Sequence, residues 1–277
     1  MSKYLITLDV DGTLLDNNYR SNSPTINSVI EQLTREGNIF IINSNRSLED
    51  MQSVARLFDL RGPLIGENGC FIYNQETGAT EILLSADGQR QIAEMRARVW
   101  PLIEQKFSSA KFMVGDTTDI NKHIDVQDIP IGCDSVFIMN EFREYSISVH
   151  AKRIENGLMV RDVDLARRLF DVVTQLIKDN GWQLRAEYTN SYANVLVLPI
   201  EASKPQALHR VTERFPHFKS VVIGDDAADK PLRAEIDYFF VVNNGTSEAK
   251  AMADYVAEQP ITKGVEEILL KIDSLVK

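Results

Sequence analysis

The fold is set by the stretch YLITLDVDGTLLD, residues 4–16. Its first five residues, YLITL, are mostly apolar or β-branched and predict a buried strand. Asp9 and Asp11 follow this strand at once, and Gly12 and Thr13 come next. Carboxylates this close repel one another, so their position at a strand end calls for a partner that compensates their charge.

Composition limits the class of protein. The chain has 277 residues, of which 44% are hydrophobic and 25% charged, typical of globular domains. The net charge of −10 and the lack of a long basic run argue against nucleic acid or an anionic membrane as partners. Cys70 and Cys133 lie far apart without a CxxC motif, which favours free thiols. We find no signal-peptide pattern and no apolar run of roughly 18 residues, so we expect a cytoplasmic protein.

Strand and helix patterns alternate in the first and last parts of the chain. Residues 23–37 and the stretch from Ser47 have helical periodicity, and residues 39–42 (IFII) predict a short buried strand. The same alternation returns after residue 203, with an apolar strand at 220–224. It predicts an α/β fold in which a Rossmann-like parallel sheet is connected by right-handed crossovers.

Between these parts the pattern changes. Residues 70–84 indicate a β-hairpin that turns around residues 76–78, residues 86–107 and 162–180 indicate helices, and residues 112–140 give no clear assignment. We therefore expect a discontinuous core domain, residues 1–82 and 199–277, interrupted by an inserted α+β domain, residues 83–198.

Polar side chains stand where strands of the expected core sheet end. Open parallel sheets bind ligands at the carboxyl ends of their strands, so groups far apart in sequence should converge there. These groups are Asp9, Asp11, Ser44, Asp225, Asp226 and Asp229, together with Lys204 at the start of a helix.

The chemistry of this set suits phosphoryl transfer. Several carboxylates at one edge need a divalent cation, and oxygen ligands favour Mg²⁺. One aspartate can attack phosphorus, and its neighbour two residues on can donate a proton to the leaving alcohol. Lys204 and the Ser44 hydroxyl can hold phosphate oxygens as charge redistributes.

At this point the chain resembles the haloacid dehalogenase-like phosphatase superfamily. The residues that carry the resemblance are DVDGT (9–13), Ser44 after an apolar strand, Lys204, and GDDAAD (224–229). Three further segments resemble the Cof-type members with a class IIB cap: NSNR (43–46), GENGCFIY (66–73) and TKGVEEIL (262–269). The resemblance implies a Rossmann-like core with an α+β cap inserted between the second and third motifs.

The resemblance also implies catalytic roles. Asp9 would be the nucleophile that forms an aspartyl-phosphate, and Asp11 would act as general acid and then as base. The Asp9 carboxylate, the Asp11 backbone carbonyl and Asp225 would hold Mg²⁺. The expected phosphate-binding or substrate-binding residues are Ser44, Lys204, Asn45 and Arg46, with Asp229 and Asp226 behind the metal or Lys204.

The resemblance has departures, and other functions stay open. Ala228 stands where the fourth motif usually has asparagine, and Pro205 follows the motif lysine in place of glycine. We expect a phosphatase for small phosphorylated metabolites, such as sugar phosphates or phosphoglycerate-type esters. The alternatives are a sugar phosphomutase that uses the same aspartates and a catalytically weak protein that binds phosphometabolites.

Each site residue also has a plain structural explanation. Asp9, Asp11, Ser44 and Asp225 could cap turns or helices, and Asp226 could start a helix without a direct metal bond. Lys204, Asp229 and Arg46 could be solvated surface residues. In the inserted domain, the segment EFREYSISVHAKR (141–153) places cations on or beside a strand. These cations either contact the substrate or lie on a solvated sheet face.

Overall fold

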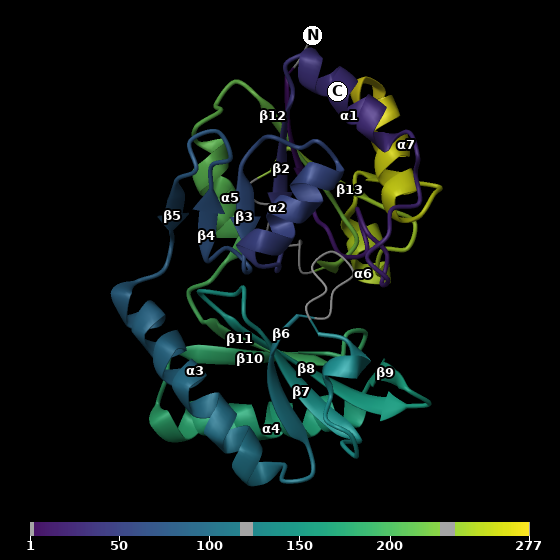
Figure 1. Ribbon diagram of the computed structural model, residues 1–277. Coiled ribbons are helices and arrows are strands. Elements are labelled where there is room, and N and C mark those ends of the chain that lie inside the picture. The colour runs from purple at the N-terminus through teal and green to yellow at the C-terminus, as the bar shows by residue number, and fades with distance from the viewer. Residues whose placement is uncertain (1–2, 117–123, 228–235, 277) are drawn as a thin grey trace. The chain divides into compact units, whose positions relative to one another are not determined.

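A computed structural model describes residues 3–116, 124–227 and 236–276. The chain forms two compact units, Met1–Leu83 with Ser203–Lys277 and Leu84–Ala202. Figure 1 labels most of the helices and strands of both. We refer to them as the core unit and the inserted unit.

The core unit contains an eight-stranded sheet in the order β14-β13-β12-β1-β2-β3-β4-β5. Neighbouring strands from β14 to β3 are parallel, whereas β4 and β5 form an antiparallel edge. This arrangement confirms the predicted α/β class. The strands are β1 (Tyr4–Leu8), β2 (Ile39–Asn43), β3 (Leu64–Gly66), β4 (Phe71–Tyr73), β5 (Thr80–Ile82), β12 (Lys219–Gly224), β13 (Tyr238–Val241) and β14 (Tyr255–Val256).

Five helices accompany this sheet in the described part of the core unit. The Ser47 side chain caps α2 by accepting a hydrogen bond from the Asp50 amide. Buried residues of α5 and α6 pack in one hydrophobic cluster with Leu5 of β1 and Ile41 of β2. The helices are α1 (Ile26–Arg35), α2 (Leu48–Leu57), α5 (Lys204–Thr212), α6 (Ser247–Met252) and α7 (Ile261–Leu275).

The strand register brings three distant segments together. In the parallel ladders Leu8 pairs with Ile42 of β2 and with Ile223 of β12. The residues that follow these three positions therefore lie side by side at the carboxyl edge of the sheet, as expected for adjacent parallel strands.

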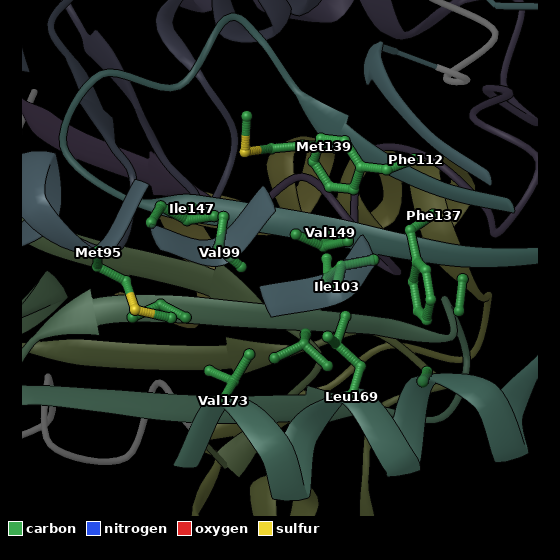
Figure 2. Packing of buried hydrophobic residues seen from close by; sticks show 14 of the residues in the cluster. Met95, Val99, Ile103, Phe112, Phe137, Met139, Ile147, Val149, Leu169 and Val173 are labelled. Carbon is green, nitrogen blue, oxygen red and sulfur yellow. The ribbon is translucent and has the colours of Figure 1, made fainter. Parts of the chain in front are cut away.

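The inserted unit is built on a sheet in the order β10-β11-β8-β7-β6, with β9 paired to β8. Side chains from one face of this sheet pack with α3 and α4 in a hydrophobic cluster (Figure 2). The stretch 112–140 contains β7, most of β6 and a short 3₁₀ turn, Val126–Asp128. The elements are α3 (Ala86–Lys106), β6 (Lys111–Gly115), β7 (Ser135–Asn140), β8 (Ile147–Glu155), β9 (Leu158–Arg161), α4 (Val163–Asn180), β10 (Leu184–Thr189) and β11 (Asn194–Pro199).

Both cysteines are free, as predicted: Cys70 is buried and Cys133 is partly exposed. Across the described ranges, no helix is both long enough and apolar enough to cross a membrane.

Candidate active site

The nucleophile predicted at residue 9 lies directly after β1 and is anchored to both a neighbouring strand and a helix. Its backbone amide donates to the Ile223 carbonyl over 3.0 Å. The Lys204 ammonium, at the first residue of α5, donates to Asp9 Oδ1 over 2.9 Å. Burial raises the pKa of the Asp9 carboxyl, while Lys204 opposes that shift. The structure thus brings together two predicted site residues that are 195 positions apart in sequence.

The second aspartate has a different cationic partner. Arg46 Nη2 donates to Asp11 Oδ1 over 2.7 Å, and Arg46 Nε donates to Asp11 Oδ2 over 3.1 Å. Burial alone would lower the pKa of Arg46, but the Asp11 carboxylate outweighs burial and raises it. The Arg46 guanidinium also lies 4.9 Å from the centroid of the Tyr19 ring. The sequence predicts Arg46 either as a substrate-binding residue or as a surface residue at a helix start. In the structure Arg46 is buried and its guanidinium binds Asp11, the predicted general acid.

The loop after β1 is held against Asp225 at the end of β12. Thr13 Oγ1 donates to Asp225 Oδ1 over 3.1 Å. Gly12 has a φ of +85°, and a Cβ built there would lie 2.3 Å from Asp225 Oδ2. Only glycine therefore admits the Asp225 carboxylate so close to this loop. Asn244 Nδ2 donates to the Gly12 carbonyl over 2.7 Å and holds the loop from another side.

Ser44 is buried after β2, and its hydroxyl accepts a hydrogen bond from the Arg46 amide over 3.3 Å. Asn45 between them is partly buried. Asp226 is exposed beside Asp225, and Asp229 lies outside the described residues, as does Ala228. Most of the predicted set therefore lies on the ends of β1, β2 and β12 and the start of α5.

The loop of residues 66–69 contacts two parts of this site. The amide of Glu67 donates to the Arg46 carbonyl over 3.0 Å, and that of Asn68 donates to the Ser44 carbonyl over 3.3 Å. Gly69 has a φ of +87°, and a Cβ there would lie 2.2 Å from the Ser203 carbonyl oxygen. The loop thus binds the segment after β2 and packs against the backbone that leads into Lys204.

Sequence reasoning missed Asn43, the last residue of β2. Asn43 is 2% exposed, and in the described part of the chain neither its Oδ1 nor its Nδ2 has a hydrogen-bond partner. Asn43 follows Ile42 as Asp9 follows Leu8, so the parallel register places the two side by side. A buried amide without partners costs free energy, and here that cost falls beside the predicted nucleophile.

The site offers oxygen donors of the kind that Mg²⁺ prefers. In the ranges that the structure describes, no group of three or more His, Cys, Asp or Glu side chains could hold a metal ion. The oxygens of Asp9, Asp225 and the Asp11 carbonyl are hard donors, and Mg²⁺ binds through one or two carboxylates while keeping several waters. The desolvated Asp9 carboxylate gains from a nearby cation as well. The residues therefore fit Mg²⁺.

A family model described as haloacid dehalogenase-like hydrolase matches residues 6–269. The chain belongs to the haloacid dehalogenase-like hydrolase family. This confirms the resemblance seen in its motifs.

Individual relatives match at full length and low identity. A phosphoglycolate phosphatase of Staphylothermus marinus is 23% identical over 273 residues, which are 97% of each chain. A haloacid dehalogenase-like hydrolase of Bacteroides thetaiotaomicron superposes with a TM-score of 0.68 at 15% identity, over 98% of this chain and 99% of that one. A HAD/COF-like hydrolase of Plasmodium vivax gives a TM-score of 0.66 at 19% identity, over 100% and 97%. These structures share the fold of this haloacid dehalogenase-like hydrolase.

Proposed function

We propose that this protein is a Mg²⁺-dependent phosphatase that hydrolyses small phosphorylated metabolites through an aspartyl-phosphate on Asp9. The observation that carries the proposal is that Asp9 and Asp11 have different cationic partners, Lys204 and Arg46. Two carboxylates in distinct environments can take distinct roles, one as nucleophile and one as acid and base.

Asp9 suits the role of nucleophile. One of its oxygens is fixed by Lys204, so the carboxylate has a defined direction from which to attack phosphorus. The Lys204 ammonium lies where it can also bind an oxygen of the transferred phosphoryl group.

Asp11 suits the role of general acid and base. Its side chain is 28% exposed, so the carboxyl can reach a leaving-group oxygen and then a water molecule. The two hydrogen bonds from Arg46 fix its orientation, because a planar guanidinium matches a carboxylate at two points. Proton transfer at Asp11 would first release the alcohol and then activate the water that hydrolyses the aspartyl-phosphate.

Mg²⁺ would be held by Asp9, the Asp11 carbonyl and Asp225. When bound, it would neutralise charge on the phosphoryl group and on the crowded carboxylates. Thr13 and Gly12 keep Asp225 next to the loop that carries both aspartates.

The substrate class is proposed from two sources. The relative from Staphylothermus marinus is named for phosphoglycolate, a small phosphorylated acid. The negative net charge of the whole chain argues against nucleic acid as a partner. We propose a small phosphate monoester as substrate, of the sugar phosphate or phosphoglycerate type, in the cytoplasm. The inserted unit would be the cap domain that selects the leaving group.

The test is a release assay for inorganic phosphate over some tens of phosphorylated metabolites, with Mg²⁺ and with excess EDTA. We expect release from a subset of small monoesters with Mg²⁺, little release with EDTA, and recovery when Mg²⁺ is restored. Isomerised sugar phosphate without free phosphate would instead identify a mutase. Binding of a metabolite without any turnover would identify the weak binding protein.

A further inference from the structure

Tyr19, in the segment that follows the loop after β1, has a strained backbone. Its φ is +61°, in the left-handed region that a bulky side chain seldom adopts. The two residues before it, Asn17 and Asn18, are of a type that tolerates this region better, yet the tyrosine occupies it. Strain of this kind persists only where other contacts compensate for it, so the Tyr19 side chain is the place to look for one.

A closed turn around Asp16 holds Tyr19 in this conformation. Asp16 Oδ1 accepts from the Asn18 amide over 2.8 Å and from the Arg20 amide over 2.9 Å. The Asp16 carbonyl accepts from the Tyr19 amide over 2.9 Å, and the Asp16 amide donates to the Arg20 carbonyl over 3.0 Å. Hydrogen bonds on both sides of Tyr19 thus fix the backbone from which its ring projects.

The Tyr19 ring lies against the guanidinium of Arg46. The central carbon of the guanidinium, Cζ, is 4.9 Å from the ring centroid. This distance is inside the limit of roughly 6 Å for a cation–π contact, and such contacts are strongest where the cation is removed from water. Arg46 meets that condition, because it is 5% exposed.

The printed hydrogen bonds of the Arg46 guanidinium lie along one edge. Nε and Nη2 donate to the two oxygens of Asp11. Nη1 is buried, and within the described ranges of the chain it has no hydrogen-bond partner. Two hydrogen bonds along one edge do not by themselves stop the planar group from tilting about that edge, whereas a ring against its face does.

We propose that Tyr19 is a positioning residue for the general acid: its ring fixes the plane of the Arg46 guanidinium, and Arg46 in turn orients the Asp11 carboxylate. The inference rests on the proposed phosphatase function, in which Asp11 gives its proton to the leaving alcohol. Tyr19 itself needs no contact with the substrate for this role. Loss of the ring should therefore slow proton donation, which depends on the orientation of the acid.

The first experiment measures kcat/KM for an alkyl phosphate from the metabolite panel. Tyr19→Leu keeps the strained backbone and removes the ring, and we expect kcat/KM to fall by about 10-fold. Tyr19→Phe keeps the ring and should retain most of the activity. Tyr238→Leu is the matched control. The Tyr238 ring lies 5.8 Å from Lys219 Nζ, and Tyr238 begins β13, at the end of the parallel strands away from Asp11. This variant should stay within about twofold of wild type.

The leaving group shows whether the effect passes through Asp11. An alkyl phosphate releases a strongly basic alkoxide that needs a proton, whereas p-nitrophenyl phosphate releases a weakly basic phenolate that needs little protonation. Because kcat/KM reports only the steps up to release of this group, Tyr19→Leu should lower it by about 10-fold for the alkyl ester and by less than about threefold for p-nitrophenyl phosphate. Equal losses for the two esters overturn the proposal.

Tyr19→Asn separates the ring from the backbone strain. Asparagine tolerates the left-handed conformation better than leucine, so Tyr19→Asn should unfold at a higher urea concentration than Tyr19→Leu. Both variants lack the ring, so both should show the same low kcat/KM for the alkyl ester. If kcat/KM recovers together with stability in Tyr19→Asn, Tyr19 supports only the fold and the proposal fails.

A measurement without turnover keeps this result separate from the proposed function. In protein with isotope-labelled arginine, the NMR signal of the Arg46 Nε hydrogen is identified by its loss in Arg46→Lys. Its exchange with water should be at least ~10-fold faster in Tyr19→Leu than in wild type or Tyr19→Phe, because the ring no longer restrains the guanidinium. Equal exchange in all three proteins overturns the proposal. If the wild type hydrolyses no phosphate ester, the phosphatase function fails, while the exchange rates still decide whether the Tyr19 ring holds Arg46 in place.

Discussion

Arg46 and Asp11 form a two-point ion pair, with Arg46 Nη2 2.7 Å from Asp11 Oδ1 and Arg46 Nε 3.1 Å from Asp11 Oδ2. The arginine is nearly buried, with a side chain that is 6% exposed, whereas the aspartate side chain is 28% exposed. A rigid group therefore orients a carboxylate that still reaches solvent. Arg46 therefore affects Asp11, the predicted general acid, in two ways: its positive charge and the orientation that its planar guanidinium imposes. A substitution that keeps the charge tests the effect of orientation alone.

Arg46→Lys should keep the positive charge and lose the planar two-point contact. We expect kcat to fall by about 10- to 100-fold with little change in KM, because general acid–base catalysis contributes about 10²–10⁴ and depends on orientation. The measurement is steady-state kinetics on the best ester of the metabolite panel. Arg35→Lys is the matched control, because the Arg35 side chain is 75% exposed and pairs with a surface carboxylate, Glu31. Equal kinetics for the two variants would contradict the orienting role.

Asp9→Asn should abolish turnover, because an amide oxygen is a poor nucleophile for phosphorus. We expect phosphate release to fall to the assay background while circular dichroism and the midpoint of thermal unfolding show a folded protein. Asp59→Asn is the control: the Asp59 side chain is 61% exposed and pairs with Arg61 at the surface, so the activity of this variant should stay within about twofold of wild type. Residual turnover by Asp9→Asn would refute the assignment of the nucleophile.

Gly69→Ala should destabilise the protein more than an alanine at another left-handed glycine. Both Gly69 and Gly78 have positive φ, at +87° and +71°, so both substitutions carry about 1–2 kcal/mol of backbone strain. At Gly69 the new Cβ would also lie 2.2 Å from the Ser203 carbonyl oxygen, whereas at Gly78 the nearest atom, Tyr73 Oη, is 3.9 Å away. Steric overlap should add about 1–3 kcal/mol at Gly69.

Urea unfolding of the two glycine variants measures this difference directly. The displaced backbone leads into Lys204, so Gly69→Ala should also raise KM, and Gly78→Ala should not. Equal losses of stability at the two sites would show that the contact between Gly69 and Ser203 is unimportant.

Asn43→Leu should raise stability and lower activity. Removing a buried amide that lacks partners in the described residues should raise the free energy of unfolding by about 1–3 kcal/mol. If the Asn43 amide supports catalysis by the neighbouring Asp9, kcat should fall by roughly 10-fold. A gain in stability with a loss of activity is the common trade-off at functional sites.

The control is Asn38→Leu, since Asn38 is similarly buried but fully engaged. Its Oδ1 accepts from the Tyr4 amide over 2.8 Å, and its Nδ2 donates to the Leu33 carbonyl over 2.9 Å. Asn38→Leu should therefore lower stability. A loss of stability in Asn43→Leu as well would mean that its amide is satisfied in solution.

His150 should make the protein less stable as the pH falls. Its pKa is lowered from 6.5 to about 3 by burial and by Lys152, Arg143 and Arg161. Between these values the unfolded chain binds a proton that the folded chain does not, so stability is lost as the pH decreases through this window. Urea unfolding at pH 7 and pH 5 should show a smaller decrease for His150→Gln than for wild type. Parallel decreases would show that His150 titrates normally in the folded protein.

The core fold was predictable because its signals are local. Each signal lies within a few residues of sequence. The examples are the five apolar or β-branched residues before Asp9, the apolar strand IFII, and the helix that Ser47 caps. Residues 112–140 were not predictable, since β6 and β7 lack clear alternation and are stabilised by pairing with each other and, for β7, with β8.

The residue types at the ends of the predicted strands follow from the order of amino acids alone, and they identify Asp9, Asp11, Ser44, Lys204 and Asp225 as a candidate site. The partners of these residues follow from the folded chain: Lys204 contacts Asp9, Arg46 contacts Asp11, and Thr13 contacts Asp225. Strand patterns depend on neighbours along the chain, whereas hydrogen bonds between residues 35 to 212 positions apart depend on sheet register and loop geometry. Asn43 was missed for the same reason, because its importance depends on its place beside Asp9 in the neighbouring strand and on the hydrogen bonds that its amide lacks in the described residues.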